Sequence, residues 1–159
     1  MDLFLVRHAR AVAPAKGTPD AARRLTQRGR AQTRRLRRVL RRVGIRFDRL
    51  VHSPLLRALE TADGLASLLD GESLVTQRLN GRPTEELLAD LQGTCVAVVG
   101  HEPYLASLAA WLIGKTTDGV SSFRLPPAGF SWLTGDPRPG GMRLHALLPP
   151  RVQRALVRR

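Results

Sequence analysis

Short uncharged runs alternate with helical patterns along this chain, and that alternation limits the fold more than any other feature. Residues 94–99 form a β-branched run about six residues long, which is typical of a buried strand. Shorter runs at 3–6 and 47–52 have the same character. Strands that alternate with helices predict βαβ units. We therefore expect a three-layer α/β/α sandwich around a mainly parallel sheet, with residues 130–134 and 142–148 adding an antiparallel edge.

The helix boundaries follow from capping residues. Thr26 can cap a helix that continues to Val43 and stops at Gly44. Ser53, followed by a proline at the first helical position, predicts a helix that reaches about Leu69. The remaining expected elements are an edge strand over 74–79, helices over 83–91 and 104–113, and a basic, frayed tail over 151–159.

The length of 159 residues suits one domain that spans residues 1–159 and builds its own core. A single cysteine, Cys95, excludes a disulfide-built scaffold. No uncharged run approaches the ~20 apolar residues of a membrane span, and the N-terminus lacks the pattern of a signal peptide. These features predict a cytoplasmic protein that does not associate with membranes. They leave the oligomeric state open, although we expect a monomer.

The chain is strongly basic, with 26 Lys and Arg against 13 acids and a net charge of +13. Such a surface attracts polyanions and anionic substrates. One expected helix carries seven arginines: Arg30, Arg34, Arg35, Arg37, Arg38, Arg41 and Arg42. Three roles remain open for these arginines. They form a solvated helix face, they steer an acidic phosphoprotein toward the chain, or they bind a polyanion in a protein that is not an enzyme. Aromatic residues make up only 4%, so we expect no specific nucleic-acid partner.

Basic side chains follow three of the expected strands. Arg7 and His8 follow the first strand, and Arg57 lies one turn into the helix after the second strand. His101 and Glu102 follow the strand at 94–99. Because ligands of open α/β sheets bind outside the carboxyl ends of the strands, we expect these groups to meet there. Arginine forks and a helix N-terminus suit a phosphoryl group.

Two histidines at one phosphate-binding site indicate covalent phosphoryl transfer. A neutral imidazole attacks phosphorus if its other nitrogen is held as a donor, and a cationic second imidazole stabilises the equatorial oxygens. The sequence has no Gly-rich phosphate loop with lysine and no acidic metal cluster, so we expect neither a metal nor another cofactor.

Four segments occur in a familiar order and spacing: Leu5-Val6-Arg7-His8-Ala9, Leu25-Thr26 with Gly29 and Gln32, Ser53-Pro54 with Arg57-Ala58 and Thr61-Ala62, and Val99-Gly100-His101-Glu102-Pro103. Together they resemble the histidine phosphatase superfamily, which has the phosphoglycerate mutase-like fold. The short chain and the late segment 125–129 look most like the SixA-type phosphohistidine phosphatases.

The resemblance implies a role for each matched residue. His8 would be the nucleophile, and Arg7, Arg57 and His101 would hold the phosphoryl group, with no metal. From the residues themselves, we expect Ser53 to cap a helix or to contact the phosphate through its hydroxyl, and Glu102 to form part of the substrate pocket rim or to favour the positive helix start. The implied substrate is a phosphorylated protein, specifically protein phosphohistidine. The alternative on the same fold is a small-molecule phosphomonoester phosphatase or mutase.

The chain departs from the family pattern at three places. Ala9 replaces the usual glycine, and Arg10 stands where larger relatives have an acid. No acid follows the third strand before Glu85 and Glu86, so the general acid is one of these two or absent. A missing acid favours phosphohistidine, because imidazole leaves more readily than an alkoxide. Three other candidates are weaker: His52 is strand filler or pocket wall, His145 is structural, and Cys95 is a buried, inert thiol.

Overall fold

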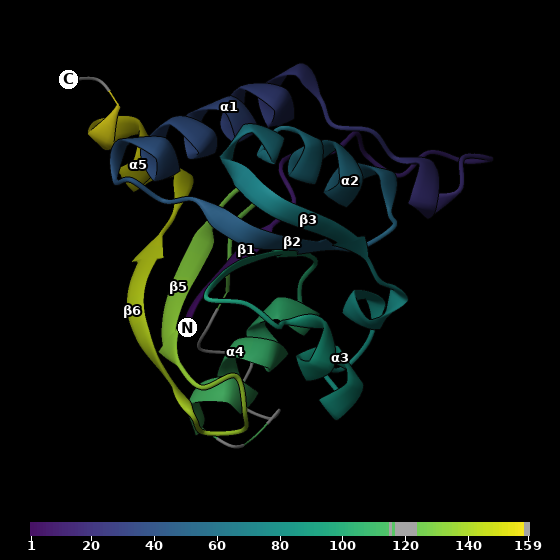
Figure 1. The fold of residues 1–159 in the computed structure, drawn as a ribbon. Coiled ribbons are helices and arrows are strands. Elements are labelled where there is room, and N and C mark those ends of the chain that lie inside the picture. Colours follow the sequence, from purple (N-terminus) through teal and green to yellow (C-terminus); the bar gives the residue numbers. More distant parts are fainter. Residues whose placement is uncertain (115, 117–123, 158–159) are drawn as a thin grey trace.

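A computed structural model describes residues 1–114, 116 and 124–157 of the chain (Figure 1). Its strands are β1 (Asp2–Arg7), β2 (Phe47–His52), β3 (Leu69–Val75), β4 (Cys95–Gly100), β5 (Phe130–Gly135) and β6 (Met142–Leu148). Its α-helices are α1 (Gln27–Arg42), α2 (Leu56–Asp63), α3 (Glu85–Asp90), α4 (Tyr104–Gly114) and α5 (Pro150–Leu156). Single-turn 3-10 helices occupy Asp20–Ala22, Ala66–Leu68 and Gln77–Asn80.

The sheet has the strand order β3-β2-β4-β1-β5-β6. The pairs β2–β3, β2–β4 and β1–β4 are parallel, whereas β5 runs antiparallel to β1 and to β6. Helices α1 and α2 cover one face, and α3 and α4 cover the other (Figure 1). The predicted sandwich with an antiparallel edge is therefore confirmed.

Strand β1 feeds both cores because its side chains alternate between the faces. Leu3 and Leu5 pack in the cluster that includes residues of α4, and Phe4 and Val6 pack in the cluster that includes residues of α1 and α2. All four are fully buried. The ring of Phe4 stacks on Trp132 of β5 at 5.0 Å. A strand buried on both faces is held firmly, so its carboxyl end is a fixed point for the residues that follow it.

The boundaries of α1 agree with the sequence. The Thr26 hydroxyl accepts from the Gly29 backbone N–H at 3.0 Å, and Gly44, just after the helix, has a φ of +77°. The buried face carries Leu36, Leu40 and other residues that pack toward the sheet.

Three expectations were wrong. The helix after Ser53 begins at Leu56 and ends at Asp63, because the chain turns at Gly64 and then pairs with β2 as β3. That strand occupies Leu69–Val75 rather than 74–79, and its polar, exposed residues hide it from periodicity. The tail over 151–159 is not frayed in its described part, since it forms α5 and the side chain of Gln153 is fully buried.

Gly29 allows α1 to lie against the chain that follows β1. A Cβ at this position would overlap the carbonyl oxygen of Arg10. Alanine would by itself favour the helix by up to about 1 kcal/mol. Because the overlap is with backbone, we expect Gly29→Ala to lower the free energy of unfolding by about 1–2 kcal/mol, as measured by urea-induced unfolding. Gly81→Ala is the control, since Gly81 has open space and a φ of −144°. Equal stability of the two variants would contradict this account.

Candidate active site

The parallel pairing of β1 with β4 brings two histidines together. Arg7 is opposite Gly100 in the register, and the backbone N–H of His8 donates to the carbonyl of Gly100 at 3.0 Å. His8 and His101 therefore leave the sheet at the same edge. Their ring centroids are 5.0 Å apart, so both imidazoles can contact one small ion.

The hydrogen bonding of His8 fixes its tautomer. Nδ1 lies 2.8 Å from the carbonyl oxygen of Ala9. A carbonyl only accepts, so Nδ1 carries the proton and Nε2 keeps its lone pair. Burial, aided by the nearby cations Arg57 and Arg7 and opposed by the bond to Ala9, lowers the pKa of His8 to about 4. At neutral pH the ring is therefore uncharged and nucleophilic at Nε2.

A chain of hydrogen bonds orients His101. Its Nε2 lies 2.7 Å from the hydroxyl of Ser53, and that hydroxyl lies 2.7 Å from Oδ1 of Asn80. The Asn80 amide is itself oriented, because Nδ2 donates to Oε1 of Gln77 at 2.8 Å. Ser53 donates to Asn80 and accepts from His101, which places the proton of His101 on Nε2. Ser53 is thus bound to His101 and is not the cap of α2.

His101 is uncharged in the free protein. Burial, together with the charges of His8 and Arg57, lowers its pKa to about 3. Its Nδ1 is buried and has no hydrogen-bond partner within the described residues. The cationic form considered from the sequence therefore needs an anion beside Nδ1, because a negative charge raises the pKa of an adjacent imidazole.

The two arginines differ in their present partners. Arg7 donates from Nη1 to the carbonyl of Leu125 at 2.8 Å, and its buried Nε has no partner among the described residues. Arg57 is 7% exposed and donates to the backbone oxygen and the carboxylate of Asp20, at 2.8 and 2.9 Å. An anion at the site would meet a free donor on Arg7 and would compete with Asp20 for Arg57.

Glu102 lies at the rim and also holds the rim together. Its carboxylate accepts from the backbone N–H groups of Leu125 at 2.7 Å and Ala106 at 3.3 Å. With Arg7, Pro103 and Arg124 it lines a pocket of about 270 Å³. Both readings of Glu102 from the sequence, pocket rim and acid at a helix start, therefore agree with its position.

The remaining sequence candidates lie outside the cup formed by Arg7, His8, Arg57 and His101. His52 is 5% exposed, and its Nδ1 is bound to the Ser53 carbonyl at 3.1 Å. His145 is exposed on β6, where its ring contacts Trp132. Burial raises the pKa of the Cys95 thiol to about 11, in keeping with an unreactive thiol.

Glu85 and Glu86 lie exposed in the first turn of α3. In the described part of the chain, no hydrogen bond or ion pair joins either carboxylate to the cup. A hydrogen bond from Thr84 lowers the pKa of Glu86, so its protonated form is scarce at neutral pH.

Sequence reasoning missed Asp20 and Asn80. Asp20 lies before α1. Hydrogen bonds from Arg23, which has the larger effect, and from Arg57 lower the pKa of its carboxyl. No periodicity or cap marks either residue, because each acts through a tertiary contact. Once the burial of Arg57 is known from the structure, its charge indicates that a carboxylate lies nearby.

The described residues contain neither a membrane-spanning helix nor a cluster of metal-binding side chains. No helix in them is both long and apolar enough to cross a membrane. No group of three or more His, Cys, Asp or Glu side chains in those residues is arranged to hold a metal ion.

The sequence matches the histidine phosphatase superfamily (branch 1) over residues 3–82, which is about half of the chain. An uncharacterized protein of Picosynechococcus sp. is 37% identical over 125 residues, covering 73% of this chain and 76% of that protein.

Solved structures share the fold along almost the whole chain. The structure of the protein histidine phosphatase SixA complexed with tungstate has a TM-score of 0.78 at 24% identity, and covers 95% of this chain and 98% of that one. The alpha-ribazole phosphatase of Shigella flexneri has a TM-score of 0.74 at 22% identity, covering 94% and 97%.

The depressed pKa values of the two histidines predict the pH dependence of stability. The unfolded chain binds protons at these rings below about pH 6.5, whereas folded His8 does so only near pH 4. Stability should therefore fall as the pH falls through this window. Urea unfolding across it should show a weaker dependence for His8→Asn than for the natural chain. NMR detection of a His8 titration near its ordinary pKa would refute the prediction.

Ser53 is a positioning residue for His101. Ser53→Ala removes the acceptor for the Nε2 proton, so we expect nitrogen NMR shifts of His101 to change from one tautomer to a mixture. Ser53→Thr keeps a hydroxyl and should restore the single tautomer. An unchanged spectrum in the alanine variant would show that another group orients the ring.

Proposed function

The chain belongs to the histidine phosphatase superfamily and is a phosphatase, and we propose that it is metal-independent and transfers its substrate's phosphoryl group through His8. His8 and His101 carry this proposal. Nε2 of His8 keeps its lone pair, the centroids of the two rings are 5.0 Å apart, and one buried and one half-buried arginine lie beside them. We place this activity in one domain that spans residues 1–159.

The reaction takes two displacements. Nε2 of His8 attacks phosphorus, the bond to the leaving group breaks, and the leaving group takes a proton from solvent water. Water then attacks the phosphohistidine in line, releasing inorganic phosphate and restoring His8. Arg7 and Arg57 hold the equatorial oxygens, and a phosphoryl group in place of the Asp20 carboxylate keeps the donors of Arg57 satisfied. The negative charge raises the pKa of His101, so that Nδ1 becomes a donor to the same oxygens.

Protein phosphohistidine is the substrate class we propose. Asp20, whose carboxylate accepts from Arg57 of the cup, has a lowered pKa and is therefore a poor proton donor. Imidazole leaves phosphorus as a neutral amine once it is protonated, so it needs less help than an alkoxide. The likeness to a protein histidine phosphatase bound to tungstate, a tetrahedral oxyanion, supports this choice.

A small phosphomonoester is the second candidate. The pocket of about 270 Å³ beside Arg7 and Arg124 suits a small anionic group, and an alpha-ribazole phosphatase shares the fold. Preference for sugar phosphates over a phosphohistidine peptide would favour this reading.

The activity test uses a phosphohistidine peptide and p-nitrophenyl phosphate, both in EDTA. We expect turnover with the natural chain, and a loss of about a thousandfold or more in kcat for His8→Asn, because the variant cannot form the covalent intermediate. Protein quenched in alkaline detergent, where phosphohistidine is stable, should carry phosphate on His8. His145→Asn, which changes an exposed histidine of β6, is the matched control and should keep its activity. Activity that survives His8→Asn, or that EDTA abolishes, would overturn the mechanism.

A further inference from the structure

A second depression lies beside the active site. Its volume is about 390 Å³, and arginines from three segments line it: Arg10, Arg28, Arg151 and Arg154, together with Gln32 and the proline pairs at 126–127 and 149–150. We call it the basic groove. The expected catalytic groups line none of it, so it is separate from the cup that holds the phosphoryl group.

Hydrogen bonds join the walls of the basic groove to the active site. Gln32 accepts from the backbone N–H of Arg10 at 3.0 Å and donates to the carbonyl of Pro127 at 3.4 Å. The backbone N–H of Ala128 in turn donates to the carbonyl of Arg7 at 3.1 Å. The fully buried Gln153 of α5 donates to the Ala128 carbonyl at 2.8 Å. A ligand in the groove is therefore held at a fixed place relative to His8.

The charge of the basic groove is unbalanced. Helices α1 and α5, which pack together, contain no acidic residue. The four groove arginines are exposed, and in the described part of the chain none takes part in an ion pair, although six ion pairs occur elsewhere in that part. Four guanidinium groups around one depression favour a ligand with several negative charges.

The shape and lining of the basic groove favour an acidic polypeptide over a nucleic acid. Four prolines give its walls apolar surface, on which the aliphatic parts of a peptide can pack. The chain has two tryptophans and one tyrosine, which provides little stacking surface for bases. We propose that the basic groove binds an acidic segment of the protein substrate while the phosphohistidine of that substrate occupies the cup. This inference rests on the proposed phosphatase function.

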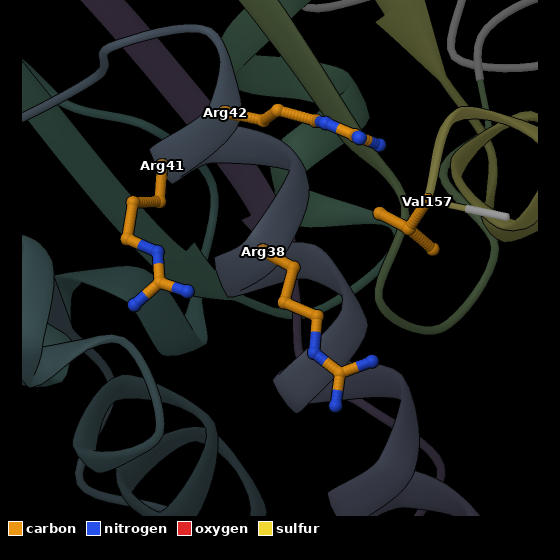
Figure 2. Close-up of a pocket in the computed structure, with 4 residues that line it drawn as sticks. All are labelled: Arg38, Arg41, Arg42 and Val157. Atoms are coloured by element: carbon orange, nitrogen blue, oxygen red, sulfur yellow. The ribbon is translucent and has the colours of Figure 1, made fainter. Parts of the chain in front are cut away.

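The other end of α1 provides a matched control. Arg38, Arg41, Arg42 and Val157 line a depression of about 250 Å³ there. Figure 2 shows the side chains of Arg38, Arg41 and Arg42 extending from α1, with the guanidinium groups of Arg38 and Arg41 set apart from each other. Arg38 and Arg41 lie about 15 and 20 Å along the helix from Arg28, given 1.5 Å per residue. Reversing two charges at either end changes the total charge of the protein equally.

The experiment compares two phosphohistidine peptides, one flanked by glutamates and one by glutamines, with p-nitrophenyl phosphate as a substrate that does not reach the groove. For the natural chain we expect kcat/KM to be about tenfold higher for the glutamate peptide, through KM. The double variant Arg28→Glu/Arg154→Glu should lose that preference and retain its rate on p-nitrophenyl phosphate. The double variant Arg38→Glu/Arg41→Glu should keep the preference.

Three outcomes would overturn the docking proposal. The first is equal use of both peptides by the natural chain. The second is equal loss of preference in both double variants, which would mean that long-range charge alone causes the preference. The third is groove-dependent binding of a short DNA duplex without groove-dependent binding of the glutamate peptide. Binding of the unphosphorylated peptides, followed by fluorescence anisotropy, separates this test from the catalytic one. If the glutamate peptide binds through Arg28 and Arg154 but no substrate turns over, the proposed function fails and the docking site stands.

Discussion

The parallel pairing of β1 with β4 positions every other part of the site. Because Arg7 is opposite Gly100, the chain leaves both strands at one level, and the bond from the His8 N–H to the Gly100 carbonyl continues the ladder one residue beyond the strand. Strand β2 lies on the other side of β4 and delivers Ser53 next to His101. A shift of one residue in this register would exchange the two faces of β1, placing Phe4 in the core beside α4 and Leu5 in the core beside α1 and α2. The packing of two cores against one strand therefore protects the geometry of the cup.

Uncharged histidines among arginines make the site dependent on its ligand. Burial and the neighbouring cations hold the pKa of His8 near 4 and that of His101 near 3, so the empty cup keeps both rings neutral. Because His8 is neutral, it is a nucleophile that needs no general base. His101 is also neutral, and it can take a proton when a phosphoryl dianion arrives, since the negative charge of the dianion stabilises the imidazolium cation. In this scheme, substrate binding and activation of the second histidine are one electrostatic event.

The sequence predicted those parts of the molecule that local patterns determine. Thr26 and Gly44 mark the ends of α1 because capping is a local interaction, and the apolar runs mark the central strands. The helix before β3 was predicted too long, because pairing with β2 outweighs helix propensity after Gly64. The expected cup residues do lie together, as the carboxyl ends of parallel strands must. The partners of Arg57 and Ser53 were not predictable, because Asp20 and Asn80 reach them from loops whose path depends on the whole fold.

The distribution of charge is more informative than its total. A coding preference for arginine would raise arginine along the whole chain, but it would not remove acids from two helices that pack together. Elsewhere several arginines pair with acids, as when Arg46 and Arg49 pair with Asp70 and Glu72 beside β2 and β3. Like charges brought together on α1 and α5 repel one another and lower the stability of the folded state. Stability alone would favour a glutamate among them, so the arrangement is best explained by an anionic partner that offsets the repulsion only when it is bound.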